Sequence, residues 1–110
     1  MSYQHKNLAA GRWNELPLVE KMANIGSEVE RALNWRIKKN IDYAQKAFDR
    51  ALELIDMTLA GDKNYAHLKE IARMREAIVD FFSGVNQFKS SEHSWRNYFL
   101  QFTYASRKNH

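Results

Sequence analysis

The chain has 110 residues, which is long enough for one domain with a single hydrophobic core. It contains no cysteine, and this excludes disulfide bonds, thiolate metal sites and cysteine nucleophiles. One proline and four glycines among many helix-forming residues favour an all-α fold, and the net charge of +4 permits an anionic partner without requiring one.

Residues 1–13 are expected to form an N-terminal arm, in which Trp13 packs as a hydrophobic staple beside Asn14, the cap of the first helix. The arm has no apolar stretch of signal-peptide length, and no run in the chain approaches the length of a membrane span. The expected location is therefore the cytoplasm, with no membrane partner.

The first helix is expected at residues 15–38, where apolar residues recur at helical spacing. Gly26 lies at the edge of its apolar stripe, although a glycine inside a helix costs ~1 kcal/mol relative to alanine. Close approach of a neighbouring helix and simple tolerance are both open explanations for this glycine.

The second helix, expected at residues 41–60, has the clearest amphipathic pattern of the chain. Its apolar side is broad, which is typical of a helix packed against two or three others. Asn40 is the expected N-cap, and Gly61 is the expected stop just beyond the helix. The apolar positions are Ile41, Ala44, Ala47, Phe48, Ala51, Leu52, Ile55, Thr58 and Leu59.

The third helix is expected at residues 63–82, with Asp62 or Asn64 as its cap. Its buried stripe includes Arg75, whose charge must be paired or must reach water along its aliphatic stem. Glu28 of the first helix is the expected partner. The other stripe positions are Tyr65, Leu68, Ile71, Ala72, Met74, Ile78, Val79, Phe81 and Phe82.

The last helix, expected at residues 91–107, is apolar on two faces. Its core side consists of Trp95, Tyr98, Phe99 and Phe102. An outer strip on nearly the opposite side is the candidate interface: His93, Leu100, Tyr104 and Arg107. Four helices leave few elements to cover this strip, so a second protein is the favoured cover, and the N-terminal arm is the alternative.

Charged residues form two further candidate sites. One is a buried or half-buried polar network: Glu28, Arg31, Arg50, Arg75, Glu76 and Asp80. An ion-pair network that fixes helix register is favoured there over a site for a small charged ligand. The other is an anion- or nucleic-acid-binding patch: Arg36, Lys38, Lys39 and Lys46. Stabilisation of the first helix through its dipole is the favoured alternative for these cations.

Motifs for catalysis are missing from the sequence. The four histidines are scattered, and glycine-rich phosphate loops, nucleophile elbows and HExxH are absent. HEPN nucleases carry an arginine followed four to six residues later by histidine, and no such pair occurs here. We expect no catalytic residue, no metal and no cofactor.

Four blocks, NIGSEVERALNW, KAFDRALELIDMTL, RMREAIVDFFSG and WRNYFLQFTYASR, resemble a set of short prokaryotic proteins with no assigned activity. The resemblance covers about residues 13–107 and implies a small helical protein. It carries over no catalytic residue and no ligand.

These patterns predict a single domain over residues 1–110, an all-α four-helix antiparallel bundle with an N-terminal arm. The expected function is a non-enzymatic interaction module that self-associates as a homo-oligomer, namely a dimer, through the outer strip of the last helix. The alternative is an RNA- or nucleotide-binding helical bundle, HEPN-like without the nuclease residues, whose binding weakens steeply with salt.

Overall fold

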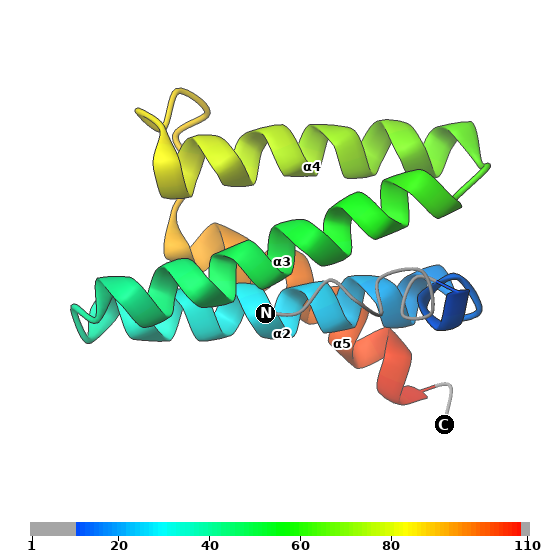
Figure 1. The fold of residues 1–110 in the computed structure, drawn as a ribbon, viewed down its shortest axis with the longest axis horizontal. Helices are drawn as coiled ribbons and strands as arrows, with labels where there is room; N and C mark the ends of the chain where they lie inside the picture. The colour runs from blue at the N-terminus through cyan, green and yellow to red at the C-terminus, as the bar shows by residue number, and fades with distance from the viewer. Residues whose placement is uncertain (1–10, 109–110) are drawn as a thin grey trace.

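The computed structural model describes residues 11–108, and these are all-helical, with no strand among them. Four long helices follow one another along the chain (Figure 1): α2 (Leu18–Ile37), α3 (Ile41–Gly61), α4 (Tyr65–Ser83) and α5 (Glu92–Lys108). A short helical segment at residues 11–14 precedes them. The predicted all-α class is confirmed, and each long helix begins and ends within three residues of its predicted bounds.

Polar side chains cap three of the long helices. Asn40 and Asn64 each accept a hydrogen bond at 3.1 Å from the backbone N–H three residues later. Asn40 is the cap predicted for α3, and Asn64 is one of the two caps predicted for α4. At α5, Ser91 Oγ accepts from the N–H of Ser94 at 3.0 Å. The cap position of α2 is Pro17, which makes no side-chain bond there.

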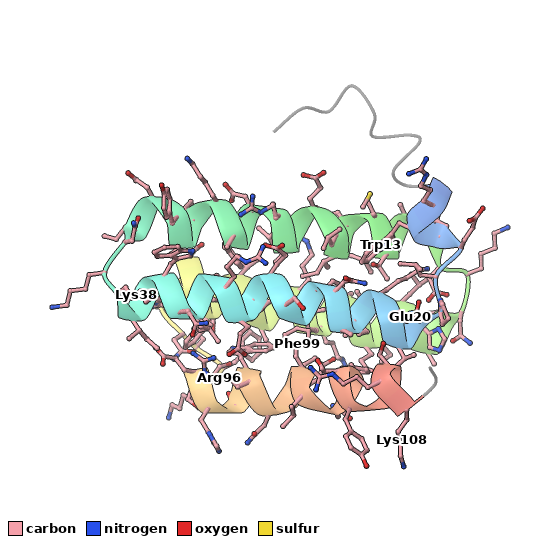
Figure 2. The ribbon with its side chains drawn as sticks, turned by 90° about the horizontal axis from the view of Figure 1, so that it is seen from below. Trp13, Glu20, Lys38, Arg96, Phe99 and Lys108 are labelled. Carbon is pink, nitrogen blue, oxygen red and sulfur yellow. The ribbon has the colours of Figure 1, made fainter. Side chains whose placement is uncertain are left out.

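The helices are arranged around α2, which lies between α3 and α5 (Figure 2). α4 packs mainly against α3. The core forms where the apolar stripes of these helices meet. Its largest fully buried side chains are Met22, Ile25, Val29, Leu33, Ile55, Ile71 and Ile78.

The N-terminal segment packs on α3 through Trp13. Its indole Nε1 donates a hydrogen bond to Thr58 Oγ1 at 2.8 Å, and both side chains are buried. Asn14 lies beside Gly61, which is the last residue of α3. The prediction that Asn14 caps the first long helix is wrong, because this segment is fixed on α3 and Pro17 holds the cap position of α2. Gly61 was predicted just beyond the second helix but is the last residue of α3. The rest of the expected arm, residues 1–10, lies outside the described residues.

α4 buries fewer side chains than its sequence predicts. Ile71, Met74 and Ile78 are buried, but Tyr65 is 78% exposed and Ala72 is also exposed. The prediction is wrong for these two residues because α4 has one main neighbour, which covers only a narrow stripe of its surface.

Candidate functional site

The predicted polar network divides into separate groups. Glu28 accepts hydrogen bonds from Arg31 at 2.9 Å and from Arg50 at 3.3 Å, which links α2 to α3. Arg75 instead donates to Asp56, with Nε 2.7 Å from Oδ1. The expected pairing of Arg75 with Glu28 is therefore wrong, because Arg75 reaches the carboxylate that α3 presents beside it.

The last two residues of the predicted network lie elsewhere. Asp80 accepts hydrogen bonds from the backbone N–H groups of Gln87 and Phe88, at 2.9 and 3.1 Å, so it shapes the loop between α4 and α5. Glu76 is exposed on α4. These placements support the structural interpretation, because each acid with a bond here fixes an adjacent helix or loop.

The four cations of the predicted anion patch lie around the α2–α3 turn, and three of them stack on aromatic rings. Lys38 Nζ is 5.2 Å from the Trp35 ring centroid, and Lys46 Nζ is 5.5 Å from that of Tyr43. Arg36 Cζ is 4.8 Å from the centroid of Phe81 at the end of α4. Such contacts orient cations on the protein's own rings, but all three residues remain exposed. RNA or nucleotide binding by this patch stays a prediction.

The fourth cation, Lys39, adopts the left-handed conformation in the turn, with φ of 63°. This conformation lets a short connection reverse the chain between α2 and α3.

The outer strip of α5 is open to solvent among the described residues. Leu100 and Tyr104 are 61% and 62% exposed, one helical turn apart. His93 shares a hydrogen bond of 3.0 Å with Asn97, and Arg107 borders a groove of about 260 Å³ between α2 and α5. The four predicted interface residues therefore follow one side of α5. Coverage by the N-terminal arm involves residues outside the described range.

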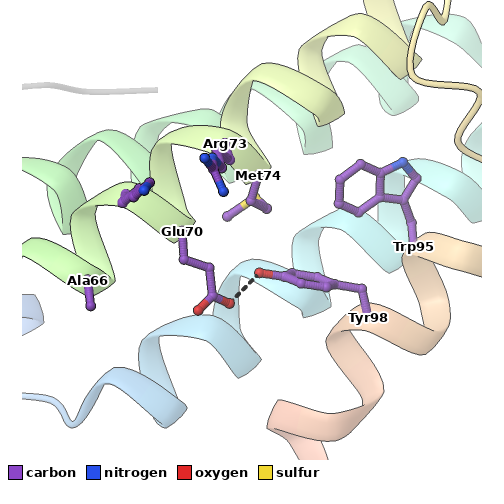
Figure 3. A pocket seen from close by; sticks show the side chains of 7 residues that line it. Ala66, Glu70, Arg73, Met74, Trp95 and Tyr98 are labelled. Atoms are coloured by element: carbon purple, nitrogen blue, oxygen red, sulfur yellow. Dashed lines mark hydrogen bonds between the residues drawn. The ribbon is translucent and has the colours of Figure 1, made fainter.

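A hollow between α4 and α5 was missed by the sequence analysis (Figure 3). It measures about 440 Å³ and is mostly apolar; its lining residues are Ala66, Lys69, Glu70, Arg73, Met74, Trp95 and Tyr98. It exists because α4 and α5 do not pack closely along their length. Periodicity places Trp95 and Met74 on inward faces correctly, but it cannot reveal the spacing between two helices.

The polar contact in this hollow joins its two helices. The Tyr98 hydroxyl donates to Glu70 Oε2 at 2.9 Å, as Figure 3 shows. Burial, followed by the hydrogen bond and the negative charge of Glu70, raises the pKa of the Tyr98 phenol well above its usual range. Tyr98 therefore remains a neutral donor near neutral pH, which suits a link between helices rather than proton transfer.

A second polar contact fixes the α3–α4 corner. Asp62 accepts a hydrogen bond from the backbone N–H of Asn64 at 2.8 Å, and its other oxygen lies 3.0 Å from His67 Nδ1. The Asn64 N–H contributes most to lowering the pKa of the Asp62 carboxyl, and His67 lowers it further against the opposing effect of burial. No group of three His, Asp or Glu side chains within residues 11–108 is placed to hold a metal ion.

Comparisons with protein-family models, curated proteins and solved structures found no match to this chain. The resemblance to short prokaryotic helical proteins therefore stays a prediction. In the described part of the chain, no helix combines the length and apolar character needed to cross a membrane.

Proposed function

We propose that the chain is a non-enzymatic helical interaction module, a four-helix antiparallel bundle that self-associates as a dimer through the outer strip of α5. One observation carries the proposal. Leu100 and Tyr104 are largely exposed on α5, while Trp95 and Phe99 of the same helix are buried against the core. A terminal helix with a second apolar strip gains stability when a partner covers that strip.

A second copy is the partner that this strip suits. In an antiparallel two-fold contact centred between Leu100 and Tyr104, each Leu100 packs against Tyr104 of the other copy, because a two-fold contact uses the same surface twice. Burial of a leucine on a tyrosine ring supplies apolar area without an unpaired charge. Arg107 lies beyond this centre, where a cation remains solvated at the rim.

The test is the molar mass in solution, measured by light scattering on the eluted protein at concentrations on the order of tens of micromolar. We expect the mass of two chains for the native protein and of one chain for Tyr104→Asp, because the new charge would be buried in the contact. Tyr65→Asp is the matched control, since Tyr65 is at least as exposed but lies on α4. A native monomer, or equal dissociation by both variants, would refute the proposal.

A further inference from the structure

Exposed apolar side chains gather at one end of the molecule. Five of the eight exposed large hydrophobic residues within 11–108 lie in or beside the α2–α3 turn and the α4–α5 loop: Ile37, Ile41, Tyr43, Val85 and Phe88. Both connections lie at the left end of Figure 1. Ile41 and Val85 are the most exposed, at 78% and 80%. Two separate chain reversals therefore present apolar side chains at the same end.

The same two connections carry lysines and no acid. Lys38 and Lys39 lie in the α2–α3 turn, and Lys89 lies in the α4–α5 loop. We call these three lysines, together with Ile37, Ile41, Val85 and Phe88, the basic end.

The nearest acids are already stabilised by the backbone. Asp42 and Glu92 lie in the first turns of α3 and α5, where the helix dipole is positive. Asp80 accepts two backbone N–H bonds from the loop. These acids keep their charge but lie in the helices, so the three lysines are the only charged side chains within the two connections themselves.

The shape of the basic end is held by specific bonds. All three non-glycine residues with positive φ in the described chain lie in its two connections: Lys39, Asn86 and Lys89. In the loop, Asn86 and Ser90 are joined by two hydrogen bonds of 2.9 Å, Asn86 Nδ2 to Ser90 O and Ser90 N to Asn86 Oδ1. A positive φ costs free energy at a residue other than glycine, and the surrounding contacts must offset that cost. The loop therefore presents Val85 and Phe88 in a fixed arrangement.

We propose that the basic end binds the surface of an anionic lipid bilayer. Aliphatic side chains at a projecting tip enter the boundary between headgroups and acyl chains, and adjacent lysines meet the lipid phosphates. This is contact with a surface and not a span, so it is compatible with the lack of a membrane-crossing helix in the described chain. It goes further than the sequence analysis, which expects no membrane partner.

Two other occupants fit the basic end less well. A second copy docked end to end would place lysines against lysines, which opposes association. Single-stranded RNA binds through bases stacked on aromatic faces, but the most exposed residues here, Ile41 and Val85, are aliphatic. Lipid is the partner whose chemistry uses both the aliphatic side chains and the cations.

The test is flotation of the full chain with vesicles at about 0.1 M salt. Vesicles of phosphatidylcholine with about one-third phosphatidylglycerol should bind the protein, and phosphatidylcholine alone should not. Neutralising Lys38→Gln with Lys39→Gln should weaken binding about 25-fold, at about fivefold per lysine. Ile37→Ser with Ile41→Ser should weaken it by at least about tenfold through lost apolar burial.

A matched control changes the opposite end of the molecule. Lys63→Gln with Lys69→Gln removes the same charge from the α3–α4 connection and the start of α4, on the order of 20–30 Å from the two connections along α4 and α3. It should change binding by less than about twofold because salt screens that distance. Equal binding to phosphatidylcholine alone, or equal loss in the control, would overturn the proposal. The proposal would also be overturned if the protein bound single-stranded RNA through Lys38 and Lys39 and did not bind anionic vesicles.

Discussion

Phe99 of α5 packs directly over Gly26 of α2. A Cβ placed on residue 26 would lie 2.7 Å from Phe99 Cβ and 2.9 Å from its Cγ, closer than such atoms can approach. Both residues are buried. Of the two explanations for this mid-helix glycine, close approach of a neighbouring helix is therefore confirmed.

Gly26→Ala should destabilise the protein although alanine is the better helix former. The methyl group meets the base of the Phe99 side chain, which cannot turn away without moving α5, and overpacking of this kind costs about 1–3 kcal/mol. The helix-propensity gain of about 1 kcal/mol offsets only part of this cost. Urea unfolding measures the difference. Ser27→Ala, one residue away on the exposed side of α2, should change stability by less than about 0.5 kcal/mol. A stabilised Gly26→Ala variant would contradict this prediction, because it would show that α5 can move away from α2 at little cost in free energy.

The positions of the helices could be predicted because the buried side of each helix appears in the sequence as a regular spacing of apolar residues. Contacts between helices could not, because they depend on which surfaces face one another. The sequence around Gly26 does not show that Phe99 packs over it, because Phe99 lies far along the chain. Tyr65 has the correct spacing for burial, yet no helix covers it. Local sequence determines where α4 runs, whereas packing determines how much of it is enclosed.

Trp13 and Thr58 should be coupled in stability through their buried hydrogen bond. Thr58→Val leaves the indole N–H without its acceptor and should cost about 1–3 kcal/mol, whereas Trp13→Phe should cost about 1–2 kcal/mol. The double variant should lose less than the sum of the two, by about 1 kcal/mol. Urea unfolding of the four proteins provides the cycle. Strict additivity would mean that the bond contributes nothing to the folded state.

Arg75 should couple to Asp56 and not to Glu28. The pair is partly open to solvent, with the side chains 38% and 54% exposed, so we expect only about 0.2–1 kcal/mol. A cycle of Arg75→Met with Asp56→Asn should show this coupling, and the same cycle with Glu28→Gln should show none. Coupling to Glu28 alone would contradict the observed pairing.

The candidate sites were predictable to the extent that they lie on single helices. The strip of Leu100 and Tyr104 follows from the spacing along α5 alone, and the structure finds both residues exposed. The hollow beside Trp95 and Met74 requires the separation of two helices, which no single segment encodes. The wrong prediction for the partner of Arg75 has the same reason. Its partner is the carboxylate that lies beside it in space, which positions along the chain do not identify.

The folded state should lose stability in acid through Asp62. The backbone N–H of Asn64, aided by His67, lowers the pKa of this carboxyl in the folded protein. A carboxyl with a lowered folded pKa binds fewer protons when folded than when unfolded. Its stabilisation is therefore full above the unfolded pKa and disappears as the pH falls from about 5 through the folded pKa.

Urea unfolding from pH 7 down to about pH 3 tests this dependence. Asp62→Asn should be less stable than the native protein at pH 7, and the gap should narrow as the pH falls. His67→Gln should keep most of the acid dependence, because the Asn64 N–H, which contributes most to the lowered pKa, remains in place. A gap between Asp62→Asn and the native protein that stays constant over this range would show that the charge on Asp62 adds nothing to the stability of the α3–α4 corner.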